Sequence, residues 1–396
     1  MTKRSHLDDL RGASKLAVEA TRGVVGLVEA MHRTIASGPA MLGKPLEGPA
    51  TALTELVYGH IKNVTEVVGA GIDGALGLLS PLLGESVPGP ERELVLAALN
   101  GVLGDYLAES KNPLAISFAL RRGGRDLSLD RAALEAAIPG ARGRIVVLVH
   151  GSCMNDQQWL RGGHDHGASL EQDLGFTAVY VRYNSGLHVS TNGRSLAAAL
   201  EALVAAWPVP ITELCLVGHS MGGLVARSAI YYGASGFRSV LRRLVCLGTP
   251  HHGAPLERGG NWIDALLGVS RYSAPLAQLG KIRSAGVTDL RYGNVIDEHW
   301  AGRDRFEPGP DARVPVPLPE GVRSFAIAAS TDAALGPSLA GDGLVPVDSA
   351  LGQHQVAERD LAFEARWIGL GMDHLALLER AEVYQVLAGW LAPLRS

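Results

Sequence analysis

A serine between glycines stands in the middle of the chain, where residues 218–222 read Gly-His-Ser-Met-Gly. An apolar run typical of a strand, residues 214–217, precedes this segment, and a helical pattern follows it directly. A G-x-S-x-G turn between strand and helix holds its serine in a strained conformation and presents the hydroxyl above the strand end. Gly218 and Gly222 lack a Cβ, which allows the strand and the helix to approach closely. We therefore predict that Ser220 is a nucleophile; the alternative is an ordinary strand–helix turn rich in small residues.

A histidine placed to act as a general base lies near the C-terminus. His374 follows the last strand candidate, residues 366–370, and precedes a closing helix predicted over residues 375–391. An imidazole at the end of a strand can reach the serine and take its proton. We predict that His374 is the base. The other histidines fall in structural turns, among them His150, His219, His251 and His252.

An aspartate between two glycines is the candidate for the acid that orients the base. Asp342 follows a predicted strand and could present its carboxylate from a loop, although Asp-Gly is also among the commonest turn pairs. Asp332 and Asp348 are rivals in the same region. Asp373, next to the predicted base, is a weaker candidate because sequence neighbours seldom face each other. Nucleophile, acid and base then follow one another along the chain in the order expected of a triad on a strand–elbow–helix scaffold.

The loop after the strand at residues 145–149 is a candidate oxyanion hole. Residues 149–152 read Val-His-Gly-Ser, and a loop there can aim a backbone N–H at a substrate carbonyl oxygen. We predict that the N–H groups of Ser152 and Met221 form the hole, with Cys153 as the second choice for the loop donor. The alternative is a simple tight turn.

Short apolar strands and helices alternate over the C-terminal two thirds of the chain. Strands are predicted at residues 115–120, 126–129, 145–149, 176–183, 214–217, 243–247, 324–329 and 366–370. Helices are predicted at residues 130–137, 195–206, about 221–232 and 375–391. This alternation predicts an α/β fold with a mostly parallel central sheet covered by helices on both faces. Ligands of such sheets bind outside the carboxyl ends of the strands, where the candidate residues fall.

Composition excludes several classes of protein. The 396 residues, 47% hydrophobic and 19% charged, can form a sizeable core in one large domain with an appendage, or in two domains. A net charge of −4 and scattered arginines give no signature of nucleic-acid binding. The 3 cysteines argue against a disulfide framework. Cys215 and Cys246 lie in predicted core strands, and Cys153 has no evident base beside it, so we interpret it as a bystander.

The sequence also bears on location and cofactors. Residues 1–10 are polar and charged, without the apolar core of a signal peptide, and no run of 18 apolar residues appears. These patterns predict a cytoplasmic protein. Serine-based chemistry requires no cofactor, and we find no defensible set of metal ligands, calcium ligands included.

The first third of the chain is predicted to be helical. Apolar residues recur at helical spacing over residues 7–36, and residues 51–79 and 91–109 give further helical patterns. We expect an N-terminal helical region over residues 1–110, followed by a catalytic domain over 111–396. The helices are either an appendage packed on that domain or a module for lipid-surface contact or oligomerisation. The mixed polar face and the lack of tryptophan weaken the membrane interpretation.

A long insertion precedes the penultimate predicted strand. Residues 254–320 carry apolar side chains partly at helical spacing and end in the proline-rich stretch 308–319. Long loops over an active site are usually functional. We interpret the insertion as a cap or lid that forms an acyl pocket, with a fixed helical decoration as the alternative.

Together these segments resemble the α/β-hydrolase superfamily, and especially bacterial lipases and esterases, including the branch similar to the catalytic domain of GPI inositol-deacylase. The resemblance covers roughly residue 112 to the C-terminus. It rests on residues 149–151, 218–223, 341–345 and 373–374 and on the Gly-Thr-Pro-His segment at 248–251. It implies an α/β-hydrolase fold with Ser220 as nucleophile, Asp342 as acid and His374 as base.

We therefore expect a serine carboxylic ester hydrolase, an esterase or lipase, that acts on ester or lipid substrates through an acyl-enzyme. An acyltransferase would use the same intermediate, and amidases and thioesterases share the triad. A rival of another class is a lipid-surface or scaffold protein with a vestigial hydrolase fold. Acyl-chain length and oligomeric state are not indicated by the sequence.

Overall fold

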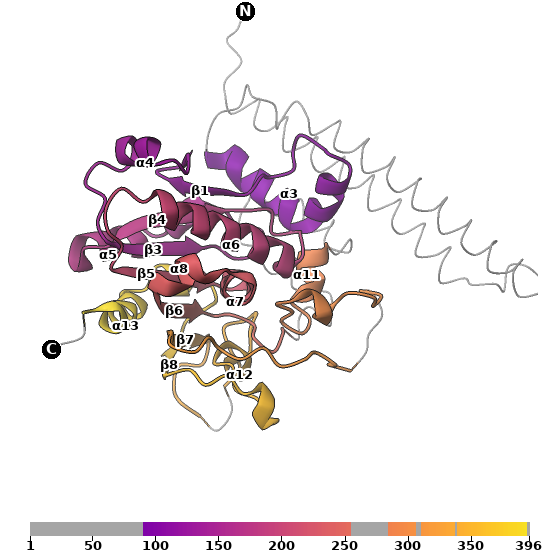
Figure 1. Cartoon of the computed structure of the whole chain (residues 1–396). Coiled ribbons are helices and arrows are strands. Elements are labelled where there is room, and N and C mark those ends of the chain that lie inside the picture. The colour runs from indigo at the N-terminus through magenta and orange to yellow at the C-terminus, as the bar shows by residue number, and fades with distance from the viewer. Residues whose placement is uncertain (1–89, 255–283, 306–309, 337–338, 394–396) are drawn as a thin grey trace, which may run out of the picture. The chain divides into compact units, whose positions relative to one another are not determined.

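The computed structural model describes residues 90–254, 284–305, 310–336 and 339–393 (Figure 1). The helices predicted over residues 7–36 and 51–79 and the first part of the 254–320 insertion lie outside these ranges. Within them, no helix combines the length and the apolar character needed to cross a bilayer.

An eight-stranded sheet forms the centre of the described chain, in the order β2-β1-β4-β3-β5-β6-β7-β8. The strands are β1 Ala119–Arg122, β2 Arg125–Asp126, β3 Arg144–Val149, β4 Thr177–Arg182, β5 Glu213–His219, β6 Leu241–Leu247, β7 Arg323–Ser330 and β8 Ala365–Leu370. β1 pairs antiparallel with β2 and β4, and all other pairs are parallel. The predicted α/β fold with a mostly parallel sheet is confirmed.

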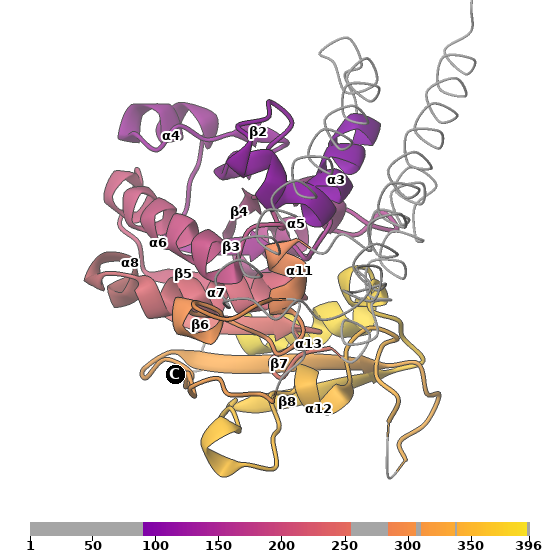
Figure 2. The ribbon, with the colours of Figure 1, turned by 90° about the vertical axis from the view of Figure 1, so that its right-hand side faces the viewer.

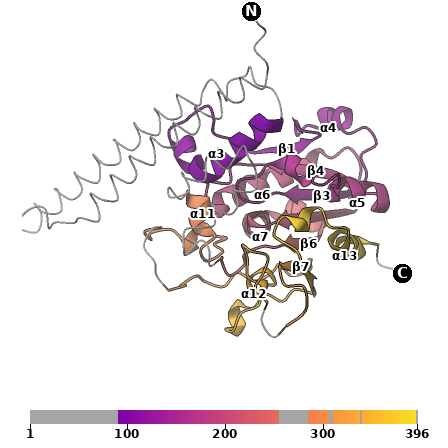
Figure 3. The same ribbon diagram turned by 180° about the vertical axis from the view of Figure 1, so that it is seen from behind.

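Helices cover both faces of this sheet. The α-helices are α3 Pro90–Glu109, α4 Arg131–Ala137, α5 His166–Leu174, α6 Val189–Ala206, α7 Met221–Tyr232, α8 Ser235–Val240, α11 Ala285–Asp289, α12 Val347–Ala350 and α13 Ala381–Leu391. Short 3-10 turns lie at η2 Asp156–Trp159, η4 Asp297–His299, η5 Ala357–Arg359 and η6 Ala376–Leu378. α6, α7 and α8 lie on one face (Figure 2). α5 and α13 lie side by side on the other, as the view from behind shows (Figure 3).

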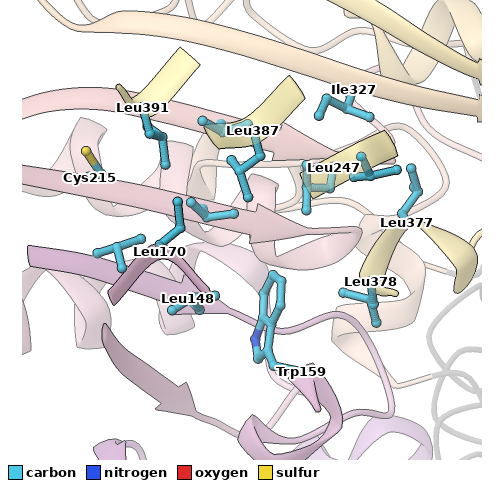
Figure 4. Packing of buried hydrophobic residues seen from close by; sticks show 14 of the residues in the cluster. Leu148, Trp159, Leu170, Cys215, Leu247, Ile327, Leu377, Leu378, Leu387 and Leu391 are labelled. Carbon is cyan, nitrogen blue, oxygen red and sulfur yellow. The ribbon is translucent and has the colours of Figure 1, made fainter. Parts of the chain in front are cut away.

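The apolar strands explain this two-sided arrangement. Alternate side chains of each central strand point to opposite faces, and Ile145 through Val149 are all completely buried. One face packs Leu148, Leu247 and Ile327 against Leu170 of α5 and against Leu387 and Leu391 of α13 (Figure 4). Burying each such leucine stabilises the fold by about 1.5–3 kcal/mol.

The closing helix differs from the prediction. It was expected over residues 375–391, but the chain first forms the turn η6, and α13 begins only at Ala381. The Asp373 carboxylate accepts hydrogen bonds from the N–H groups of Leu375 and Ala376, at 3.0 and 2.8 Å, and so stabilises a separate turn. The turn buries Leu377 and Leu378 in the core before the chain redirects into α13.

Candidate active site

Ser220 lies in a strained turn between β5 and α7. Its backbone has φ 54° and ψ −125°, a conformation that costs free energy for a residue with a side chain. A Cβ on Gly222 would lie 2.1 Å from the carbonyl oxygen of Val149, and one on Gly218 would lie 2.4 Å from the nitrogen of Gly223. Glycine is therefore required at both positions for β5, α7 and the end of β3 to approach, as the sequence indicated.

Asp342 and His374 are hydrogen-bonded to each other. Oδ2 of Asp342 lies 2.6 Å from Nδ1 of His374, and the N–H of His374 donates to the Asp342 carbonyl oxygen at 3.0 Å. Oδ1 of Asp342 accepts from the N–H groups of Leu344 and Val345, at 2.9 and 2.7 Å. Both oxygens of the buried carboxylate are thus fixed, and one of them orients the imidazole.

The rival acids lie elsewhere. Asp332 accepts hydrogen bonds from the Ser330 hydroxyl and the Ala340 N–H through its Oδ2. Asp348 is exposed, and the exposed Asp373 stabilises the turn η6. In the described part of the chain, Asp342 is the one of the four candidates that bonds to the His374 ring.

His219 connects the serine turn to the His374 loop. Its Nε2 lies 3.1 Å from the carbonyl oxygen of His374, and the two imidazole rings are 4.7 Å apart. A carbonyl oxygen can only accept, so Nε2 of His219 carries the proton and donates it. Burial, and then the neighbouring His374, lower the pKa of His219 well below its usual value, so the ring is neutral. From the sequence we assign His219 to a structural turn, and only its position next to Ser220 points to this further contact.

The loop after β3 lies against Ser220. A Cβ on Gly151 would be 3.0 Å from the Cβ of Ser220. The N–H of Cys153 donates to the Ser185 hydroxyl at 3.0 Å, so the second choice for an oxyanion donor already has an acceptor. Among the described residues, the N–H of Ser152 donates to no other protein group. Met221 begins α7, where the first N–H groups have no partner within the helix.

The helix α3 supports the same loop. A Cβ on Gly101 would lie 2.2 Å from Sγ of Cys153, so α3 passes directly over it. The Asn184 amide donates to the Gly104 carbonyl oxygen at 2.8 Å, and the Ser284 hydroxyl donates to that of Gly101 at 2.6 Å. The compact unit that contains the sheet begins at Glu93 and so includes most of α3. A domain start at residue 111 stays a prediction, but the helix before that point already contacts the site.

The buried thiol of Cys153 is not activated. Burial raises its pKa to about 12, so it is a neutral thiol near pH 7. Within the described ranges, no group of three or more His, Cys, Asp or Glu side chains could hold a metal ion.

The sheet order, the strained serine elbow and the Asp342–His374 pair at the carboxyl ends of the strands define an α/β-hydrolase fold. Residues 140–310 match the model of a family described as PGAP1-like alpha/beta domain. This match confirms the resemblance predicted from the sequence motifs. No curated protein matches the chain by sequence.

Similar solved structures include bacterial lipases. Mature lipase BlEst2 from Bacillus licheniformis is 19% identical, and the match covers 70% of this chain and 98% of that one with a TM-score of 0.42. Lipase 1 from Pelosinus fermentans is 14% identical, with 64% and 100% covered and a TM-score of 0.40. A structure described as a membrane phospholipase A and bacterial virulence factor is 18% identical, with 63% and 78% covered and a TM-score of 0.37.

Proposed function

We propose that the protein is a serine carboxylic ester hydrolase, an esterase or lipase, whose nucleophile is Ser220. The observation that carries the proposal is the strained Ser220 elbow combined with the 2.6 Å contact between His374 and Asp342. Strain is retained at positions where function requires it, and an imidazole fixed by a buried carboxylate is suited to general-base chemistry. The family match over residues 140–310 adds support.

The proposed reaction has two halves. Nε2 of His374 takes the proton of the Ser220 hydroxyl while Oγ attacks the ester carbonyl, and Asp342 stabilises the imidazolium that forms. The N–H groups of Met221 and Ser152 hold the tetrahedral oxyanion. His374 then protonates the departing alkoxide, which leaves an acyl-enzyme. A water molecule, deprotonated by His374, attacks the acyl carbon; the bond from Oγ to the acyl carbon then breaks, His374 returns the proton to Oγ of Ser220, and the acid is released.

Hydrolysis of p-nitrophenyl esters from acetyl to palmitoyl tests this proposal. The wild type should release p-nitrophenolate, and Ser220→Ala should lose nearly all of this activity while it keeps the native circular dichroism. Wild-type protein that is folded and inactive on every ester, or a Ser220→Ala variant that is equally active, would contradict the proposal. The first of these outcomes would favour an acyltransferase, an amidase or a scaffold role, and the second would indicate a different nucleophile.

An acyltransferase would use the same acyl-enzyme, with an alcohol or thiol in place of water. Added alcohol separates the two: a hydrolase should form mainly free acid at moderate alcohol concentrations, and an acyltransferase should form mainly the new ester. Thioesters and amides offered in parallel test the thioesterase and amidase alternatives.

We also propose the domain division that the sequence indicates: an N-terminal helical region over 1–110 and a catalytic domain over 111–396, in which residues 254–320 form a cap. Ser220, Asp342 and His374 are each only 2% exposed, so a substrate must enter a covered site. A chain without residues 1–89 tests the role of the N-terminal region. Loss of vesicle binding with retained hydrolysis of short esters would identify a targeting module; loss of neither would argue for a simple appendage.

A further inference from the structure

A second concave site lies beside α7, on residues that the proposed reaction does not use. It is a cavity of about 60 Å³ whose basic lining comprises Arg227, His251, His252, His299, Arg313 and Arg359. Arg227 projects from α7, two turns after Ser220, and His251 and His252 follow β6. The extended segment 314–317 closes another side.

Arg227 is a buried cation without an anionic partner. The residue is 6% exposed, and in the described part of the chain its guanidinium contacts are a histidine ring and a backbone carbonyl oxygen, not a carboxylate. One guanidinium nitrogen contacts Nδ1 of His251 at 3.1 Å, and another donates to the Val316 carbonyl oxygen at 2.6 Å. Burial lowers the pKa of Arg227 to about 10, so the group is still charged at pH 7. An uncompensated buried charge costs several kcal/mol, which a bound anion would offset.

His251 adds an unused donor to the same cavity. Its Nδ1 accepts from the Arg227 guanidinium, which can only donate, so the proton of the neutral ring is on Nε2. Burial, together with Arg227, keeps the pKa of His251 well below its usual value. Its Nε2 and Nε of Arg227 are both buried without a hydrogen-bond partner in the described ranges. Buried donors without an acceptor destabilise the fold, and a bound anion would supply the acceptor.

The other two arginines of the cavity are paired with a carboxylate. Arg313 and Arg359 share one carboxylate, Asp311, whose Oδ2 lies 2.9 and 2.6 Å from their nitrogens. Two acidic residues, Glu358 and Asp360, also line the cavity, but both are exposed. Together with Asp311 these two carboxylates balance the formal charge of the three guanidinium groups, but in the described part of the chain no carboxylate pairs with the buried guanidinium of Arg227.

We infer that this cavity binds a small oxyanion of the size and charge of phosphate, held by Arg227, Arg359 and the ring Nε2–H of His251. A guanidinium group can donate two parallel hydrogen bonds to two oxygens of such an anion. Hydrogen bonds between charged groups are also stronger than those between neutral groups. The anion would join α7 to segment 314–317, because Arg227 already holds the carbonyl oxygen of Val316. The inference stands independently of the proposed hydrolase activity.

Calorimetric titration of the full-length protein with inorganic phosphate, at constant ionic strength and pH 7.5, tests this inference. We expect one saturable site. Arg359→Gln, at a side chain that is 22% exposed, should weaken binding about tenfold or more, since a charge-assisted hydrogen bond contributes about 1.5–3 kcal/mol. Arg227→Gln should weaken it further if the variant folds. Arg323→Gln removes an exposed arginine that pairs with Glu364 outside the cavity and should bind as the wild type does.

Two results would overturn the inference: no saturable phosphate binding by folded wild-type protein, or equal binding by the wild type and Arg359→Gln. Glycerol 3-phosphate distinguishes the source of the anion. Binding as tight as that of phosphate would indicate a headgroup site, and binding of phosphate alone would indicate a site for the free ion; both outcomes support an oxyanion site.

Discussion

The Nδ1 atom of His374 lies 2.6 Å from Oδ2 of Asp342, and the same two residues are joined by a backbone hydrogen bond at 3.0 Å. The loop after β7 and the loop after β8 are therefore attached to each other at two points. This double attachment fixes both the position and the tautomer of the imidazole, because the carboxylate requires a proton on Nδ1. Nε2 is left as the basic nitrogen that the proposed reaction requires.

Replacing the Asp342 carboxylate by an amide of the same size should impair His374 as a base without leaving a cavity. We expect Asp342→Asn to lower kcat for p-nitrophenyl butyrate on the order of 10³–10⁴-fold, because an amide favours the wrong imidazole tautomer. Asp373→Asn is the matched control: this exposed side chain only accepts from two N–H groups, which an amide oxygen can also do. Similar activities for the two variants would contradict the assignment of Asp342.

His219 is a positioning residue in this account, since it holds the carbonyl oxygen of His374. We expect His219→Phe, which keeps the ring and removes the donor, to lower kcat about tenfold and leave KM nearly unchanged, because the base loop loses one anchor. His219→Asn, which retains a donor, should recover part of the loss. A purely structural role predicts instead reduced stability with an unchanged kcat for the folded fraction.

The effect of a glycine-to-alanine substitution on stability should depend on the space around the glycine. Gly222→Ala places a methyl group 2.1 Å from a backbone oxygen, and we expect it to lower the free energy of unfolding by about 3 kcal/mol. Gly389→Ala in α13 meets no atom within 4 Å and should raise that free energy by about 0.5–1 kcal/mol. Urea unfolding measures both values, and a neutral Gly222→Ala would show that the elbow is not tightly packed.

Stability should fall in mild acid. Burial lowers the pKa of His150 to about 3 and the pKa values of His166 and His299 to about 4, whereas unfolded histidines titrate near 6.5. The unfolded chain therefore binds more protons below pH 6.5, which favours unfolding. We expect each such histidine to cost about 1.4 kcal/mol per pH unit from pH 6.5 down to about 4. Urea midpoints that do not change between pH 7.5 and 5.0 would argue against neutral burial.

The three cysteine thiols should not react with thiol reagents in the native protein. All 3 cysteines of the chain are buried, and burial raises the pKa of Cys153 and of Cys246 to about 12. We expect no rapid reaction with a disulfide reagent at pH 8, three equivalents after denaturation, and full ester hydrolysis after treatment with iodoacetamide. Rapid loss of activity on alkylation would instead indicate a functional thiol at Cys153.

The sheet and the candidate residues could be predicted from the sequence because each strand and each motif consists of neighbouring residues. The apolar run at 145–149 and the Gly-His-Ser-Met-Gly turn need no distant partner to be recognised. The predicted start of α6, at residue 195, is six residues too late, because its first six residues, Val-Ser-Thr-Asn-Gly-Arg, form helices poorly. The group that caps the N-terminus of α6 is distant in sequence: the Asp289 carboxylate accepts a hydrogen bond from the Val189 N–H at 2.8 Å.

Contacts between separate segments were not predictable in the same way. The bond from His219 to the His374 carbonyl oxygen and the packing of α3 on Cys153 depend on how the elements assemble. The same holds for the Arg227 cavity, whose walls come from α7, the loop after β6 and three later segments. Apart from the position of His219 next to Ser220, no spacing in the sequence indicates these contacts.

Labelling with diisopropyl fluorophosphate followed by peptide mass analysis tests the central claim most directly. The account predicts one diisopropylphosphoryl group per chain, located on Ser220, with ester hydrolysis lost in proportion to labelling. Ser220→Ala should not be labelled. Folded wild-type protein that hydrolyses esters but is labelled at another residue, or that stays fully active after labelling of Ser220, would contradict the claim that Ser220 is the nucleophile.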